Sequence, residues 1–241
     1  SLPGDARAPS AGMGQTIGRA PLLTPPRHFV NLPKTSVYEL WEAFNDIAEG
    51  FGLTSEEMCE ILRVVLKDVL GYSEKKLDGI SRALFVTLDD DSNELVDALE
   101  FLSALALISG MSHEEKVRYI FGIYDFDESG LLSVDEMILA LRSSIAGLCK
   151  LSGIDAPLEA QIEHIAIGAF DNIKSIDGSM ITRDKFVHHC ITTPEVVSWI
   201  EYYADLDDGA DEPSRPGVDK PADKIIASLA RAPGRTARHK A

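Results

Sequence analysis

A stretch of twelve residues near the middle of the chain carries oxygen donors at alternating positions. In chain order these donors are the side chains of Asp125, Asp127 and Ser129, the backbone carbonyl of Leu131, Ser133 through a bridging water, and Glu136. Gly130 stands at the sixth position, where glycine permits the positive φ of a sharp turn. Calcium takes about six to eight oxygen ligands. The spacing therefore predicts a calcium loop, which we name the third loop, closed by both carboxylate oxygens of Glu136.

The residues on either side of the third loop keep helical spacing. Before the loop the apolar residues are Val117, Ile120, Phe121 and Tyr124, and after it they are Met137, Ala140 and Leu141. Apolar residues that recur every three or four positions indicate an amphipathic helix. A helix, a calcium loop and a second helix make an EF-hand, in which Leu132 pairs with a partner loop. The alternative is an acidic surface turn.

A second loop lies 36 residues earlier, from Asp89 to Glu100. All its ligand positions carry oxygen donors, namely Asp89, Asp91, Asn93, Leu95, Asp97 and Glu100. The sixth position holds Glu94 in place of glycine, and a left-handed backbone there costs roughly 1 to 2 kcal/mol for such a residue. The carboxylates of the loop attract a cation and repel one another. The sequence leaves open whether the second loop holds calcium.

Two further loops lack the ligands that calcium needs. The first loop runs from Asp46 to Glu57 and has Ala48, Gly50 and Phe51 at its third, fifth and sixth positions. A fourth loop begins at Asp171, is about three residues too long for a twelve-residue EF-hand loop, and has Lys185 in place of the closing glutamate. An ammonium there adds a like charge beside a cation, so we expect neither loop to bind calcium.

Composition narrows the class of protein. The formal net charge is −16 over 241 residues, and residues 36–200 hold 12 basic and 30 acidic residues. This balance excludes nucleic acid as the main partner, because phosphate binding needs a basic surface. No apolar run reaches the roughly 18 residues that a membrane span requires. Three cysteines without a CxxC pair favour a reducing compartment. We expect no enzyme, because the chain has no nucleophile elbow, phosphate loop or HExxH motif.

These patterns predict an all-α protein with four EF-hand units in two pairs. The N-terminal pair covers residues 36–109 and the C-terminal pair covers residues 110–200. Residues 1–35, rich in Pro and Gly, form an extended arm, and residues 201–241 form a tail that is first acidic and then basic. The long helix after Glu136 carries an apolar stripe, Met137, Leu141, Ile145 and Leu148, that belongs to the core or lines a groove for a target.

Several of these features together resemble the calcineurin B, neuronal calcium sensor and calaxin group of EF-hand proteins. The resemblance rests on the segment from Gly110 to Lys116 that leads to Tyr124 and Asp125, on the long helix after Glu136, and on the disabled first loop. It implies a cytoplasmic calcium sensor or regulatory subunit that grips a helical segment of a partner protein. The alternative is a structural subunit of a larger, cytoskeletal or ciliary assembly, in which one calcium ion stiffens a static scaffold.

Overall fold

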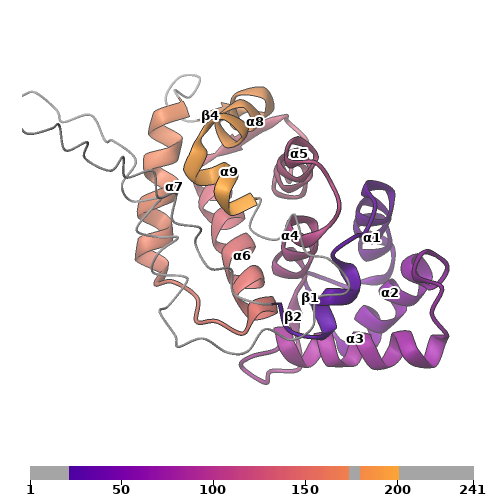
Figure 1. Ribbon diagram of the computed structural model, residues 1–241. Helices are drawn as coiled ribbons and strands as arrows, with labels where there is room; N and C mark the ends of the chain where they lie inside the picture. The colour runs from indigo at the N-terminus through magenta and orange to yellow at the C-terminus, as the bar shows by residue number, and fades with distance from the viewer. Residues whose placement is uncertain (1–21, 174–179, 201–241) are drawn as a thin grey trace, which may run out of the picture.

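The computed structural model describes residues 22–173 and 180–200, with the side chains of Glu195, Ser198 and Trp199 left out. The described residues fold mostly into helices, with only short strands (Figure 1), which confirms the predicted all-α class. The elements are η1 (Pro25–Phe29), α1 (Lys34–Ile47), β1 (Gly52–Leu53), α2 (Ser55–Leu70), α3 (Glu74–Leu88), β2 (Val96–Asp97), α4 (Ala98–Ile108), α5 (His113–Tyr124), β3 (Leu131–Ser133), α6 (Val134–Ser152), α7 (Glu159–Ile173), β4 (Met180–Thr182), α8 (Arg183–Thr192) and α9 (Pro194–Ile200).

A helix, a short strand and a second helix follow one another repeatedly along the chain. The strands join these units in two antiparallel pairs. β1 lies beside β2 with Leu53 opposite Val96, and β3 lies beside β4 with Leu132 opposite Ile181. The predicted pairing of Leu132 with a partner loop is therefore confirmed. All four of these apolar side chains are buried, so each small sheet ties two loops together through its apolar centre.

Capping residues fix where the helices that leave the loops begin. Ser133 accepts a hydrogen bond from the backbone of Glu136 and caps α6, while Thr54 and Glu57 form the same capping box at α2. A third box, between Ser112 and Glu115, starts α5, and a serine followed three residues later by a glutamate is the sequence pattern that predicts such a box. In each box the serine or threonine and the glutamate satisfy backbone N–H groups that have no partner within the helix.

The prediction of an extended arm over residues 1–35 is wrong for the segment just before α1. Residues 25–29 form the 3₁₀ helix η1, and Phe29 and Leu32 are buried in the core. The backbone N–H of Leu23 donates to the carbonyl of Leu151 at 2.9 Å, and that of Gly110 donates to the carbonyl of Leu32 at 3.1 Å. Both of these partners belong to the C-terminal pair, and η1 also contacts α3 and α4 of the N-terminal pair, so this segment docks against both halves of the molecule. Residues 1–21 and the tail at 201–241 lie outside the described residues.

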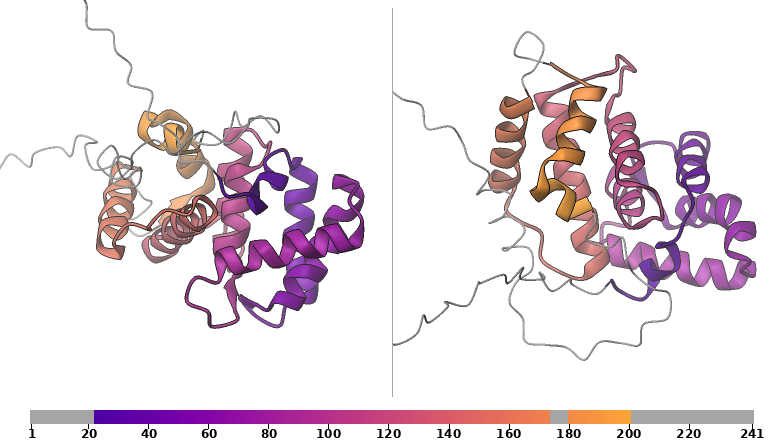
Figure 2. Two further views of the ribbon diagram at one scale, coloured as in Figure 1. Left: turned by 60° about the horizontal axis from the view of Figure 1, so that its bottom comes forward. Right: turned by 45° about the horizontal axis from the view of Figure 1, so that its top comes forward.

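α4 is the central helix of the fold. In Figure 1 it lies between α1 and α6, and its residues from Ala98 to Ile108 are buried apart from Glu100. Figure 2 shows from two further sides that α7 lies on the far side of α6 from the N-terminal helices. The hydroxyls of Ser103 on α4 and Tyr124 on α5 lie 3.0 Å apart and share a buried hydrogen bond. One core thus runs through both pairs of units.

The fourth unit differs from its prediction in where its loop begins and in an additional helix at its end. α7 continues through Ile173, so the residues from Asp171 to Ile173 that made the fourth loop look too long belong to a helix. Thr182 caps α8 by accepting from the backbone N–H of Lys185 at 3.4 Å. Lys185 thus follows β4 in the sequence by the same number of residues as Glu136 follows β3. Residues 174–179 lie outside the described residues, and α9 is a helix that the sequence did not predict.

Candidate calcium sites

The third loop gathers oxygen atoms from several of its predicted ligands. Asp125 ends α5 and is 4% exposed, and its Oδ2 accepts from the backbone N–H of Gly130 at 2.9 Å. The hydroxyl of Ser129 lies 3.3 Å from Oδ1 of Asp125 and 3.4 Å from the carbonyl oxygen of Leu131. Oxygens that share a calcium ion at about 2.4 Å are themselves about 3.4 Å apart in octahedral geometry. Both separations from the Ser129 hydroxyl are close to this value.

The backbone of the third loop is turned as an EF-hand loop requires. Glu128 and Gly130 have φ values of 55° and 72°, and the second of these is the left-handed turn predicted at the sixth position. Asp127 accepts from the backbone N–H of Ser129 at 3.0 Å. Hydrogen bonds from Ser129, chiefly from its hydroxyl, hold the pKa of Asp127 below its ordinary value. Asp127 is thus kept in the charged form that a cation requires.

Glu136, the predicted closing ligand, points at the start of α6. Its Oε2 accepts from the backbone N–H of Ser133 at 2.8 Å and from the hydroxyl of Ser133 at 2.9 Å. Within residues 22–173 and 180–200, no three Asp, Glu, His or Cys side chains converge on a point that could hold a metal. One carboxylate oxygen of Glu136 is thus engaged at the start of α6.

A positively charged side chain, Arg183, lies at the third loop, and the sequence analysis did not predict it. Nη2 of Arg183 is 3.5 Å from Oδ2 of Asp125, and its guanidinium lies 5.1 Å from the centre of the Phe121 ring. The pairing of β3 with β4 places it there, because the backbone N–H of Arg183 donates to the carbonyl of Gly130 at 3.3 Å. The only sequence signal is its position directly after the paired strand. Arg183 partly balances the charge of Asp125.

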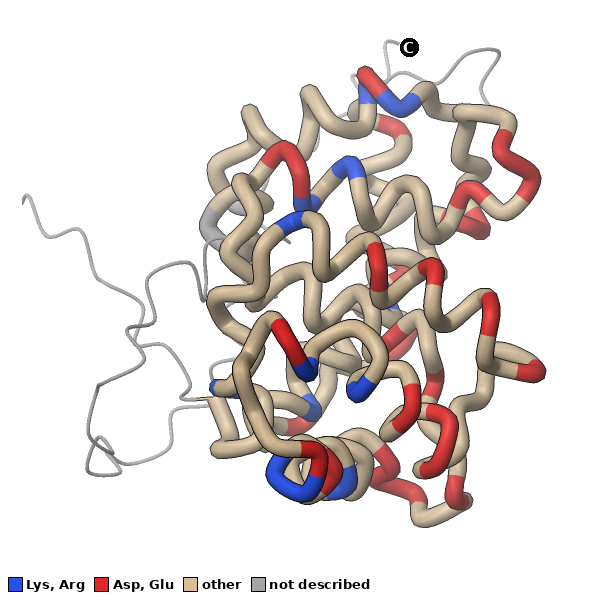
Figure 3. The backbone as a smooth tube through the Cα atoms, turned by 90° about the vertical axis from the view of Figure 1, so that its right-hand side faces the viewer, with Lys and Arg blue, Asp and Glu red and all other residues tan. Residues whose placement is uncertain are grey.

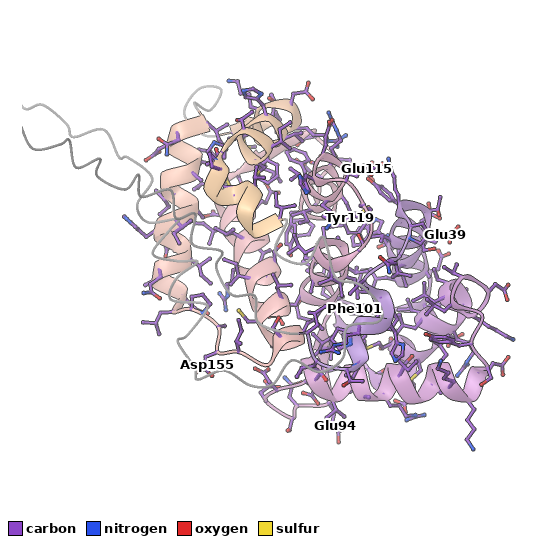
Figure 4. The ribbon with its side chains drawn as sticks, viewed as in Figure 1. Glu39, Glu94, Phe101, Glu115, Tyr119 and Asp155 are labelled. Carbon is purple, nitrogen blue, oxygen red and sulfur yellow. The ribbon has the colours of Figure 1, made fainter. Side chains whose placement is uncertain are left out.

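The second loop has the same backbone turns as the third. Ser92 and Glu94 have φ values of 56° and 66°, at the positions of Glu128 and Gly130. Glu94 therefore adopts the left-handed backbone that is costly for a residue other than glycine. Figure 4 shows Glu94 at the outer edge of the molecule, on the loop between α3 and α4.

The predicted ligands of the second loop bond mainly to the loop itself. Asp89 accepts from the backbone N–H groups of Asn93 at 3.1 Å and Glu94 at 3.2 Å, and Asp91 accepts from the side-chain amide of Asn93 at 2.8 Å. The amide oxygen of Asn93 accepts from the backbone N–H of Leu95 at 2.8 Å. Hydrogen bonds from the protein thus support the acidic side chains of this loop.

The two ligands nearest α4 are engaged elsewhere. Asp97 caps α4 through the backbone N–H groups of Leu99 and Glu100. Oε2 of Glu100 lies 2.8 Å from Nζ of Lys150, which is also 3.0 Å from Oδ1 of Asp90. Burial raises the pKa of Glu100, and Lys150 reverses only part of that rise. Burial also acts to lower the pKa of Lys150, but Glu100 and Asp90 outweigh it and raise that pKa.

The first loop uses its glutamate only as a cap. Glu57 accepts from the backbone N–H of Thr54 at 2.8 Å and from that of Glu49 at 3.2 Å. These bonds, chiefly the one from Thr54, lower the pKa of Glu57. The loop supplies no acidic side chain at its third or fifth position. Glu57 is thus a structural counterpart of Glu136 without a set of calcium ligands beside it.

An apolar cavity of about 90 Å³ lies between α5, α6, α7, α8 and α9. Met137 and Leu141, two residues of the predicted apolar stripe, line it, and α9 contributes Val196 and Ile200. The other two stripe residues, Ile145 and Leu148, are buried in the core. The helix that starts at the third loop therefore also forms a wall of this cavity.

Acidic positions gather along one edge of the described structure (Figure 3). Many acidic positions, drawn in red in Figure 3, lie along the right-hand edge of that view, where few basic positions lie. No helix among the described residues is long and apolar enough to cross a membrane. An acidic surface attracts divalent cations from a distance.

Known proteins were compared with the chain. No family model matches it. Calaxin of Xenopus laevis is 29% identical over 83 residues, which are 34% of this chain and 38% of calaxin. A recoverin family protein of Dictyostelium discoideum is 23% identical over 192 residues, 70% of this chain and 80% of that protein. Calcineurin B of Candida glabrata is 37% identical over 73 residues, 30% of this chain and 40% of that protein.

The chain thus spans less than half the length of that calaxin and that calcineurin B. The chain accordingly resembles, at low identity, EF-hand calcium-binding proteins of the calaxin, recoverin and calcineurin B kinds.

Proposed function

We propose that the chain is a calcium sensor whose third loop binds one ion and passes the signal to α6. The hydroxyl of Ser129 carries this proposal, since its separations from Oδ1 of Asp125 and from the carbonyl oxygen of Leu131 are close to those of oxygens that share a calcium ion. Asp127, Ser133 through a water, and Glu136 complete the set. The ion supplies a double positive charge around which these oxygens converge.

The movement of Glu136 makes this site a switch. Its carboxylate caps α6 through Ser133, so drawing it toward Asp125 pulls on the first turn of that helix. Met137 follows Glu136 directly and lines the apolar cavity. A shift of α6 therefore widens or exposes apolar surface, which is how sensor EF-hands present a groove to a partner helix. The partner is a helical segment of a protein, in a cytoplasmic, cytoskeletal or ciliary setting.

A second candidate is a static structural subunit. The docked segment around η1 and the ion pair between Lys150 and Glu100 favour it, because both fasten the two halves of the molecule together. In that case an ion in the third loop stiffens the C-terminal pair without moving α6.

Dye binding distinguishes the two functions. A dye that fluoresces on apolar surface is added to the calcium-free protein, and calcium is then titrated in. The sensor predicts a rise in fluorescence that is lost in Glu136→Gln and kept in Glu57→Gln. Glu57→Gln is the matched control, since it makes the same change in the same kind of capping box, in a loop without the calcium ligands. Calcium binding without a change in fluorescence supports the structural subunit and contradicts the sensor.

A further inference from the structure

The ion pair between Lys150 and Glu100 joins two loops that are distant in the sequence. Lys150 lies in the last turn of α6, the helix that begins at the third loop, and Glu100 is the closing residue of the second loop. The Nζ atom of Lys150 lies 2.8 Å from Glu100 and 3.0 Å from Asp90. The side chains of Lys150 and Glu100 are only 21% and 19% exposed. Water screens such a pair less than it screens a surface pair.

The backbone of α6 fixes where this ammonium lies. A Cβ atom on Gly147 would lie 2.3 Å from the carbonyl oxygen of Glu100 and 2.9 Å from Cβ of Ala104. Glycine thus lets α6 approach the first turn of α4 at this point. Lys150 follows Gly147 by about one helical turn and so projects from the same face of α6. The reach of Lys150 to Glu100 therefore depends on α6 lying against α4.

The ammonium of Lys150 pairs with the carboxylate of Glu100, which calcium would need as a ligand in the second loop. An EF-hand loop closes when the glutamate at its last position gives both oxygens to the ion. In the second loop one of those oxygens, Oε2 of Glu100, faces Nζ of Lys150. A single positive charge at this place repels a divalent ion at close range.

We propose that Lys150 is an internal competitor for calcium in the second loop and couples that loop to the third loop through α6. The coupling rests on the proposed calcium binding by the third loop. When Glu136 moves and α6 shifts at its first turn, the contact at Gly147 loosens and Lys150 leaves Glu100. The second loop then accepts a divalent ion. Since coupling is reciprocal, an ion in the second loop favours binding in the third.

Calorimetric titration with calcium tests the competition directly. The third loop is first silenced with Glu136→Gln, so that remaining heat comes from elsewhere. Into this background we introduce Lys150→Gln, or Lys67→Gln as the control that removes an equal charge from a surface pair with Glu74. Lys150→Gln is expected to strengthen binding at least about tenfold relative to the control. A further Glu100→Gln change should abolish that gain.

Two results would overturn the competition. One is an equal affinity in the Lys150→Gln and Lys67→Gln backgrounds, and the other is a gain that survives Glu100→Gln. Both results are separate from the proposed function, because the third loop is silent throughout. Failure of the unaltered third loop to bind calcium would remove the coupling but leave the competition at Glu100 in place.

Chemical labelling of the unmutated chain tests the coupling, and a variant serves only as a control. Reductive methylation followed by mass spectrometry measures how fast each lysine reacts. Lys150 is expected to react several times more slowly than Lys67 without calcium and to approach it with calcium. The calcium effect should vanish in Glu136→Gln. A Lys150 rate that matches Lys67 without calcium, or that calcium leaves unchanged, contradicts the proposal.

Discussion

Nη2 of Arg183 lies 3.5 Å from Oδ2 of Asp125, although 58 residues separate them in the sequence. The β3–β4 pairing brings the two together, since Leu131 lies opposite Thr182 and Arg183 comes next. Asp125 is the predicted first ligand of the third loop, and its side chain is only 2% exposed. The fourth loop, which lacks its own closing glutamate, thus contributes a positive charge to its neighbour.

Replacing this arginine should strengthen calcium binding. Arg183→Gln removes a charge that is partly exposed and therefore partly screened, so we expect an affinity gain of about threefold to tenfold. Arg118→Gln is the matched control, because Arg118 pairs with Glu114 and contacts Asp184 rather than a loop ligand. Calorimetric titration measures both variants. Equal affinities in the two variants would contradict a specific effect of Arg183 on Asp125.

The sixth positions of the second and third loops should respond oppositely to substitution. Glu94→Gly relieves a left-handed backbone at φ 66°, and we expect about 0.5 to 1 kcal/mol of added stability after the greater freedom of glycine in the unfolded chain is subtracted. Gly130→Ala should destabilise by about 1 kcal/mol. No side chain crowds Gly130, so the cost is one of backbone alone. Urea unfolding without calcium measures the stability of both variants. Stability changes of the same sign would contradict a strained backbone at Glu94.

Short-range patterns were the part of the site that the sequence could predict. Ser112 and Glu115 form their capping box, Gly130 takes its left-handed turn, and Leu132 pairs with a partner strand. Each depends on residues within one loop or one helical turn, or on the pairing that EF-hand loops share. Whether the loops hold calcium stays a prediction, because ion binding depends on how far the ligands rearrange.

The features that the sequence could not predict depend on contacts between residues far apart in the chain. Lys150 and Arg183 act on loops far from them in the chain, and neither stands at a ligand position. The docking of η1 depends on a surface that α3 and α4 build together, and a proline-rich composition does not reveal that surface. The predicted loop start at Asp171 is wrong because an acidic residue at that place suits either a loop or a helix end.

The contact at Gly147 should be intolerant of even one added methyl group. Gly147→Ala sets a Cβ against the carbonyl of Glu100 and should destabilise by about 1 to 3 kcal/mol, because backbone atoms of two helices must separate. Gly168→Ala on α7 is the control, since open space surrounds it and alanine favours helix by up to about 1 kcal/mol. Urea unfolding compares them. A stabilising Gly147→Ala would show that α6 does not lie this close to α4.

The buried Lys116 should make the free energy of unfolding rise with pH in the alkaline range. It is fully buried, and its Nζ donates to the carbonyl of Leu107 at 2.7 Å. Burial lowers the pKa of Lys116 to about 8. The unfolded pKa is about 10.4, so between these values the unfolded chain binds more protons than the folded chain. The stability that burial of the charge removes is therefore regained as the pH rises from the folded pKa toward the unfolded pKa.

The comparison of unaltered protein with Lys116→Met isolates this effect. From pH 7 to pH 9.5 the free energy of unfolding of the unaltered protein should rise by about 2 kcal/mol relative to the variant. Lys67→Met, at an exposed lysine, should show no such relative rise. Urea unfolding at both pH values measures the differences. A constant difference between the unaltered protein and Lys116→Met would mean that the buried ammonium keeps its ordinary pKa.

The most direct measurement is calorimetric titration of the calcium-free protein with calcium, on the unaltered chain, Glu136→Gln and Glu57→Gln. Calcium binding by the third loop predicts a site with a dissociation constant of roughly 10⁻⁷ to 10⁻⁵ M. That site should disappear in Glu136→Gln and persist in Glu57→Gln, whose capping box is matched. Equal binding by all three proteins, or no binding by the unaltered chain at two temperatures, would contradict a calcium site between Asp125 and Glu136.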